Sequence, residues 1–241
     1  MTQLLSAPSD IASWDWYVDV EGGEVLNSTT SLALSISRVL DRQSLMDLSE
    51  IRVSWHLHGQ GPIGFRSLIS LRDIQELNAE VMAERIMSSR PAGYSDTHAG
   101  QIELLGAGYL INANGERRRE EQLVDVSLLV TPDCISVALG VRHDIWMWFD
   151  FSGRPHEKIY NSNKPRLSEA LKEISEVLKT ETTPRRSYLF CHTRRRWYSN
   201  PGRLPERTWT RRNTCCDGDC SGPWDELIGS TAAQVSAPMS R

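Results

Sequence analysis

Residues 122–139, QLVDVSLLVTPDCISVAL, hold two runs of β-favouring residues on either side of the turn sequence TPD at residues 131–133. Valine, isoleucine and leucine predominate in both runs, whereas proline and aspartate are typical of tight turns. A link this short joins strands that lie side by side and antiparallel. We therefore expect strands at residues 122–130 and 134–139.

The same pattern continues on both sides of this pair of strands. Residues 102–111 and 145–149 are further β-rich runs, and turn signals at residues 112–115 and 140–144 separate them from the pair. Sequential strands joined by short links form an antiparallel meander. Four strands are therefore expected between residues 101 and 151.

Further strands are predicted before the meander. Residues 13–20 (SWDWYVDV) and 51–58 (IRVSWHLH) alternate large or apolar side chains with polar ones, as half-buried strands do. We also expect a short strand through Phe65 and Arg66.

Three amphipathic helices complete the predicted set. The first follows a cap within residues 27–29, the second runs over residues 70–87, and the third begins at Ser162 or Asn163 with Pro165 in its first turn. The inward-facing residues are Leu32, Ile36, Val39 and Leu40, then Ile74, Leu77, Val81 and Met82, and finally Leu167, Leu171, Ile174 and Leu178.

This order of elements predicts an α+β fold, in which two to three helices pack on one face of a largely antiparallel sheet. We assign this single domain to residues 1–183. From residue 184 onward the sequence shows neither a helical nor a strand period, so residues 184–241 are expected to form a disordered tail rich in Arg, Cys and Trp.

The two parts of the chain carry opposite charge. Residues 1–184 contain 26 acidic and 17 basic side chains, whereas residues 185–212 contain nine arginines and a single acid. An acidic domain suits a basic partner. The arginines are interleaved with Trp197, Tyr198 and Trp209, but no nucleic-acid-binding signature accompanies them, so we expect at most nonspecific nucleic-acid binding by the tail.

The end of the predicted domain resembles a known group of proteins. In residues 150–184, an F-x-G-R turn around Gly153 precedes an N-x-P-R-L helix opening, with Asn163 as cap, Pro165 in the first turn and Leu167 as the first core residue. This stretch resembles the closing portion of small uncharacterised actinobacterial α+β proteins. The resemblance implies a strand, a turn and a closing helix, followed by an acidic, glycine-rich segment, and it implies no activity.

His56 and His58 are candidate metal ligands. They lie two positions apart in a predicted strand and therefore point the same way, which lets two imidazoles share one ion. A zinc site needs at least one more protein ligand, and the candidates for it are His98, His143, Asp144 and Cys134. The simpler interpretation is an exposed polar face, and a metal-dependent enzyme is the alternative function.

Tryptophans are the candidate partner-binding residues. Alternation in residues 145–149 places Trp146 and Trp148 opposite Ile145 and its neighbours, so one of the two faces needs a cover from a helix or from a partner protein. Trp55 is the third candidate.

The sequence favours a binding role over catalysis. It contains no phosphate-binding loop, G-x-S-x-G or HExxH motif, so we identify no catalytic residue and expect no cofactor. We therefore expect a non-enzymatic protein-binding module. Its size and charge are similar to those of immunity proteins, so the expected partner is a basic protein such as a toxin.

The expected location is the cytoplasm. No window approaches eighteen consecutive apolar residues, and the first positively charged side chain is Arg38, so neither a membrane span nor a secretory signal with a basic start is expected. Membrane partners are accordingly not predicted.

The abrupt change at residue 184 generates a prediction about the gene. A shifted reading frame in GC-rich DNA is enriched in Arg, Trp and Cys codons, whereas a natural basic arm would be expected to use Lys as well. All four lysines lie between residues 158 and 179. Under the frameshift hypothesis, translating the other two frames after codon 184 yields an acidic or glycine-rich continuation. Early stop codons in both frames would return the tail to the basic-arm interpretation.

Overall fold

A single antiparallel sheet dominates the computed structural model, which describes residues 5–20 and 25–185. These residues belong to the compact unit Met1–Tyr188, and the second unit, Leu189–Arg241, lies outside the described residues together with most of the predicted tail. The strands are β1 (Ala12–Asp19), β2 (Asp47–Leu57), β3 (Gly61–Ser70), β4 (Thr97–Ile111), β5 (Arg117–Glu121), β6 (Asp125–Val130), β7 (Cys134–Val141) and β8 (Thr183–Arg185). The helices are α1 (Val25–Arg42), α2 (Ala79–Ser88), α3 (Glu157–Leu178) and the short 3-10 turn η1 (Asp144–Trp146).

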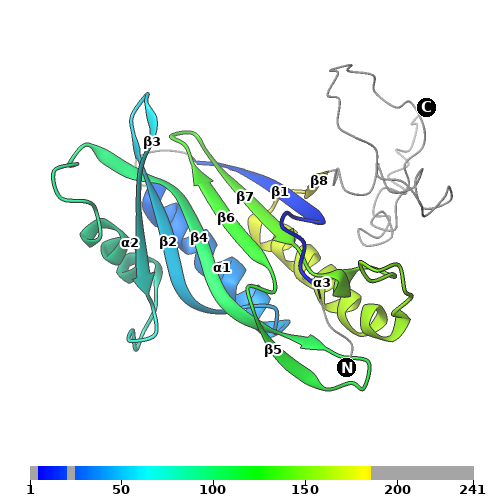
Figure 1. Ribbon diagram of the computed structural model, residues 1–241. Helices are drawn as coiled ribbons and strands as arrows, with labels where there is room; N and C mark the ends of the chain where they lie inside the picture. The colour runs from blue at the N-terminus through cyan, green and yellow to red at the C-terminus, as the bar shows by residue number, and fades with distance from the viewer. Residues whose placement is uncertain (1–4, 21–24, 186–241) are drawn as a thin grey trace, which may run out of the picture. The chain divides into compact units, whose positions relative to one another are not determined.

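The strands follow the order β3-β2-β4-β6-β7-β1-β8, and β5 pairs with β4 outside this path (Figure 1). Every described pairing is antiparallel. β1 pairs with β7 over the whole of its length, from Ala12 opposite Val141 to Asp19 opposite Cys134. Because β1 and β2 are not neighbours, α1 must cross beneath the intervening strands to connect them.

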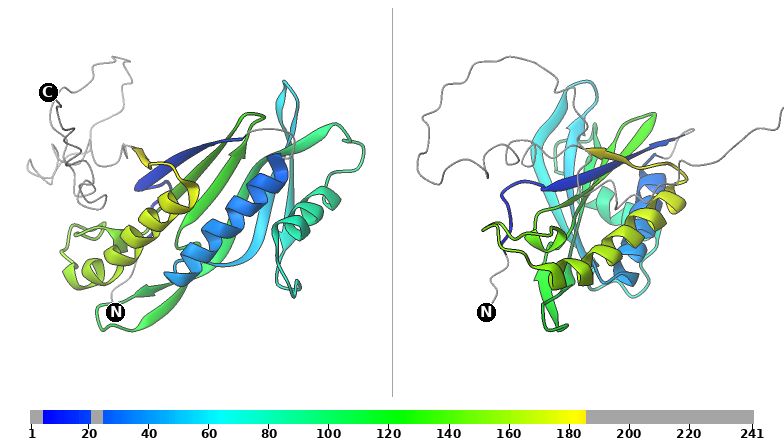
Figure 2. Two further views of the ribbon diagram at one scale, coloured as in Figure 1. Left: turned by 180° about the vertical axis from the view of Figure 1, so that it is seen from behind. Right: turned by 90° about the vertical axis from the view of Figure 1, so that its right-hand side faces the viewer.

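The three long helices lie on the same side of the sheet (Figure 2). α1 contacts β2, β4 and β6, while α3 contacts β1 and β4, and both helices contact each other. This arrangement confirms the α+β fold with helices on one face. The predicted boundary at residue 183 falls inside β8, which pairs Thr183 and Arg185 with β1. No helix in the described ranges has the length and apolar content needed to span a membrane.

Alternation in the strands supplies the core between sheet and helices. Trp14 and Trp16 of β1 are at most 1% exposed. The indole Nε1 of Trp16 donates a hydrogen bond to Ser175 Oγ of α3 at 2.8 Å. In the same layer, Trp55 of β2 donates to Ser67 Oγ at 2.9 Å. The indole N–H groups of Trp16 and Trp55 therefore have hydrogen-bond partners inside the core.

Two polar side chains of α3 fasten this helix to the rest of the domain. Asn163 accepts a hydrogen bond from the backbone N–H of Ile111 and donates one to its carbonyl. Arg166 donates to the backbone carbonyls of Gln43 and Ser44. Burial of the Arg166 guanidinium lowers its pKa to about 10, and the nearby Arg117 acts in the same direction.

The predicted strand at residues 145–149 was wrong. The chain instead forms η1, in which Ile145 and Trp146 are both at most 1% exposed. Consecutive residues of a strand point to opposite faces, whereas a tight helical turn can direct both into the core. The run of large apolar residues therefore reflects burial of a turn rather than a strand.

The predicted starts of the second and third helices were also wrong. α2 begins at Ala79, because Asn78 caps it by accepting a hydrogen bond from Val81 N, and Ile74 and Leu77 precede it. α3 begins at Glu157, so that Asn163 lies inside the helix and Pro165 is internal. β5 was missed because its sequence, RRREE, lacks the β-favouring residues that indicate a strand.

The stripe of α3 generates a stability prediction. Ile174 is fully buried, so Ile174→Ala is expected to cost about 2–4 kcal/mol of unfolding free energy through lost burial and a residual cavity. Val177 on the same helix is 39% exposed, so Val177→Ala should change stability by about 0.5 kcal/mol or less. Urea denaturation measures both variants. Equal costs would mean that the stripe is not the face that packs on the sheet.

Candidate functional site

The face of the sheet opposite the helices has no covering helix within the described part of the chain (Figure 2). Side chains of register partners point to the same face, so this face can be followed across the strands. Arg52 of β2 is opposite Glu103 of β4, Glu103 is opposite Ser127 of β6, and Ser127 is opposite Ala138 of β7, which is opposite Asp15 of β1. We call this surface the open face.

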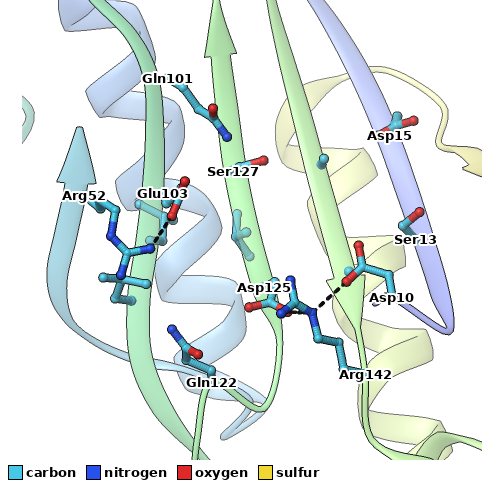
Figure 3. A pocket seen from close by; sticks show the side chains of 15 residues that line it. Asp10, Ser13, Asp15, Arg52, Gln101, Glu103, Gln122, Asp125, Ser127 and Arg142 are labelled. Atoms are coloured by element: carbon cyan, nitrogen blue, oxygen red, sulfur yellow. Dashed lines mark hydrogen bonds and ion pairs between the residues drawn. The ribbon is translucent and has the colours of Figure 1, made fainter. Parts of the chain in front are cut away.

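A hollow of about 430 Å³ lies in the middle of the open face. Its floor is made partly of small residues, among them Ser127, Ala138 and Gly140, which do not fill the space above the strands. Charged side chains surround this floor (Figure 3). They are Asp10, Asp15, Glu103, Asp125, Arg52 and Arg142.

Arg142 links two of these carboxylates. Its Nε donates to Asp10 Oδ1 at 3.0 Å and lies 2.9 Å from Asp125 Oδ2 (Figure 3). The Asp10 carboxylate is seated directly over Gly140, where an added Cβ would come within 2.6 Å of Asp10 Oδ2. A glycine at position 140 therefore lets Asp10 approach the sheet and reach Arg142.

The ionised form of Asp125 is disfavoured in this position. Burial raises the pKa of Asp125 and outweighs the opposing effect of Arg142, while Asp10 and Glu103 raise the pKa further. The hydrogen bond with Asp10 raises the pKa of Arg142, so the guanidinium gains from the arrangement. The pKa values of Asp125 and Arg142 are both raised, because two carboxylates stabilise one guanidinium while that single positive charge is shared between them.

A second ion pair lies across the hollow. Arg52 Nη1 donates to Glu103 Oε2 at 2.7 Å, and both side chains are partly exposed. The lining thus holds four carboxylates and two guanidinium groups, with Gln101 and Gln122 as polar neighbours. The hollow has a negative charge excess and offers several acceptors to an incoming cation.

The structure brings together the three histidines nearest to the end of β2. His56 and His98 are register partners with ring centroids 6.0 Å apart, and the rings of His58 and His98 stack at 4.4 Å with 21° between their planes. Imidazole lone pairs lie in the ring plane, so stacked rings direct them side by side rather than to one point. Within the described ranges, no group of three or more His, Cys, Asp or Glu side chains is arranged to hold a metal ion.

The other ligands considered for that metal lie elsewhere. Cys134 opens β7 opposite Asp19, and His143 and Asp144 are at the start of η1. The cysteines of the tail lie outside the described residues, as does its arginine cluster beyond Arg185.

The three candidate tryptophans occupy different environments. Trp55 and Trp146 are at most 1% exposed and belong to the core. Trp148 is 40% exposed, and its ring meets Tyr160 of α3 edge-on at 5.7 Å. Of the three, only Trp148 is exposed to solvent.

Sequence reasoning missed the charged residues of the hollow. Asp10, Arg52, Glu103, Asp125 and Arg142 come from five separate segments, and no local motif joins them. The available signal was the period of two, which assigns Arg52 and Glu103 to the face opposite the core. Only the strand order brings these positions together.

Comparison of the chain with protein families, with curated proteins and with solved structures finds no match. The geometry and charge of the open face are therefore the basis for assigning a function.

The raised pKa of Asp125 generates a prediction about pH dependence. An acid whose pKa is higher in the folded than in the unfolded state stabilises the fold below its unfolded pKa, and this contribution is lost as pH rises through its folded pKa. Asp125→Asn keeps the uncharged form at every pH. We therefore expect the free energy of unfolding of the variant, relative to that of the unchanged chain, to rise from pH 3 to pH 7. At pH 7 the variant should be at most about 0.5 kcal/mol less stable than the unchanged chain.

Asp150 is the matched control with the opposite sign. Its pKa is lowered by hydrogen bonds from the backbone of Arg154 and from Ser152. Ionised Asp150 therefore stabilises the fold above its unfolded pKa, so Asp150→Asn should lose stability over the same pH interval. Urea denaturation at several pH values measures both differences. The same change of stability with pH in both variants would contradict the raised pKa of Asp125.

Proposed function

We propose that this chain is a non-enzymatic protein-binding module that docks a basic partner protein on the open face of its sheet. The observation that carries the proposal is the hollow on the sheet face that none of the described helices covers, which is lined by four carboxylates and two guanidinium groups. A role of the immunity type, in which the partner is a basic toxin, is the particular form of this function that size and charge favour.

Apolar side chains on the same face support a protein partner. Leu68 is the register partner of Arg52, and Leu129 is the register partner of Gln101, so both point to the side of the hollow. Tyr17 is the register partner of Ser136, which is opposite Leu129, so Tyr17 points to the same side. These three side chains are 62%, 44% and 53% exposed, respectively. Exposed apolar and aromatic side chains around a polar centre provide area that a partner protein buries.

The charges favour a basic partner over an acidic one. The excess of nine acidic side chains in residues 1–184 steers basic proteins toward the domain from a distance. At short range, a lysine or arginine of the partner would add positive charge beside Asp125, whose ionised form is disfavoured by burial and by the nearby carboxylates of Asp10 and Glu103. The complex would then stabilise the ionised form of Asp125, which is disfavoured in the free protein.

If the hollow is the docking site, a basic probe binds there because of its local carboxylates and not because of the net negative charge of the domain. A fluorescent nona-arginine peptide should bind the full-length chain about tenfold more weakly after Asp10→Asn and Asp125→Asn together, which corresponds to about 0.7 kcal/mol for each carboxylate removed. Fluorescence anisotropy at fixed salt gives the dissociation constants.

A control variant separates the site from net charge. Glu80 and Glu84 are exposed on α2, and Glu80→Gln with Glu84→Gln removes the same charge from the helix layer. This variant should bind the peptide within about twofold of the unchanged chain. Equal weakening in both double variants, or no weakening in either, would contradict docking at the hollow.

A further inference from the structure

The cluster of His56, His58 and His98 forms a contact between the end of β2 and the start of β4. His98 is in contact with both of the other rings, because it stacks on His58 and meets His56 edge-on. His58 itself is exposed and belongs to the turn that leads from β2 into β3. The stack is therefore a direct link between this turn and β4.

The local backbone is fitted to the cluster. A Cβ at Gly100 would lie 2.1 Å from Cγ of the His56 ring, so His56 rests directly on the backbone of β4. The register between β2 and β4 shifts at this point, between Ser54 and Trp55. In the described part of the chain, His98 Nδ1 is buried without a hydrogen-bond partner. His98 therefore has no acceptor at Nδ1 for a second proton.

Neighbouring elements provide little charge to compensate a protonated cluster. The pKa of His98 is lowered by burial first, and then by the positive charges of His58 and His56. β3 places the uncharged residues Gly61 and Pro62 opposite the end of β2. On β2 and β4, Arg52 and Glu103 already pair with each other. Asp96, one residue before β4, is exposed, and Arg66 of β3 is positive and opposite Ser54.

We propose that His56, His58 and His98 form a pH-sensitive latch, which holds the β2–β3 turn against β4 when the rings are neutral and releases it when they are protonated. Imidazolium rings at stacking distance repel each other, and a protonated His98 would bury a charge that has no acceptor. The latch requires no partner and is independent of the proposed function.

The sign of the effect follows from the pKa shift. A histidine whose folded pKa is lowered takes up a proton less readily in the folded than in the unfolded state. Its contribution to local stability is complete above the unfolded pKa of 6.5 and is lost as the pH falls from there toward the lower folded value. Release is therefore expected on mild acidification below about pH 6.5.

Release would also change the proposed docking face. His56 and His98 follow Ser54 and Gln101 along the open face, so protonation adds positive charge at its margin. A basic partner would bind more weakly at pH 5.5 than at pH 7.5. This consequence, unlike the latch itself, rests on the proposed function.

The latch is tested by hydrogen exchange measured by NMR on the full-length chain. Protection factors, corrected for the pH dependence of intrinsic exchange, are compared at pH 7.5 and pH 5.0. The amides of residues 56–60 and 97–100 should lose protection at least tenfold relative to those of β6 and β7. The side chain of His98 should titrate below its ordinary pKa in the same samples.

Two variants make the test specific. His98→Gln removes the central ring and should abolish the pH-dependent loss of protection, and His58→Gln, at an exposed position, should reduce it without affecting the fold. Loss of protection that is unchanged in both variants, or unchanged protection in the original chain, would overturn the latch. A titration of His98 at or above its ordinary pKa would overturn it as well.

Discussion

A sheet that the described helices cover on one side must present two different chemistries on the same strands. Because successive side chains of a strand point to opposite faces, every second residue has to pack against the helices and every other residue has to face away from them. In β1 the first set includes Trp14 and Trp16, and the second includes Ser13 and Asp15. The helices α1 and α3 and the charged hollow therefore depend on one register, and a shift by one residue would exchange them.

The same constraint explains why the charges gather where they do. The open face is built from polar positions that the core does not use, and the small residues at its centre leave room above the sheet. Arg142 pairs with both Asp10 and Asp125, and partial burial still disfavours the ionised form of Asp125. The proposed docking of a basic partner would account for a carboxylate that is kept in this position.

The sequence was sufficient to predict the fold class, but it was not sufficient to predict the site. The alternation in residues 13–20 and 51–58 and the stripe of α3 express local periods, which are visible without any structure. The hollow has no such period, because it depends on the pairing of β1 with β7, two strands more than one hundred residues apart in the chain. His98 illustrates the same limit, since only the pairing of β2 with β4 brings it to His56. Errors at η1 and at the start of α3 arose where tertiary packing overrides local signals, as for buried Asn163.

The most direct test of the account is to locate a bound basic probe on the surface of the domain. A nona-arginine peptide with a nitroxide spin label broadens NMR signals of methyl groups close to its binding site. On the open face, the methyl signals of Leu68, Leu105 and Leu129 should broaden, while those of Val177, exposed on α3, should stay sharp. Broadening at Val177 equal to that at the three leucines would show that the peptide has no preferred face, and it would contradict docking on the open face of the sheet.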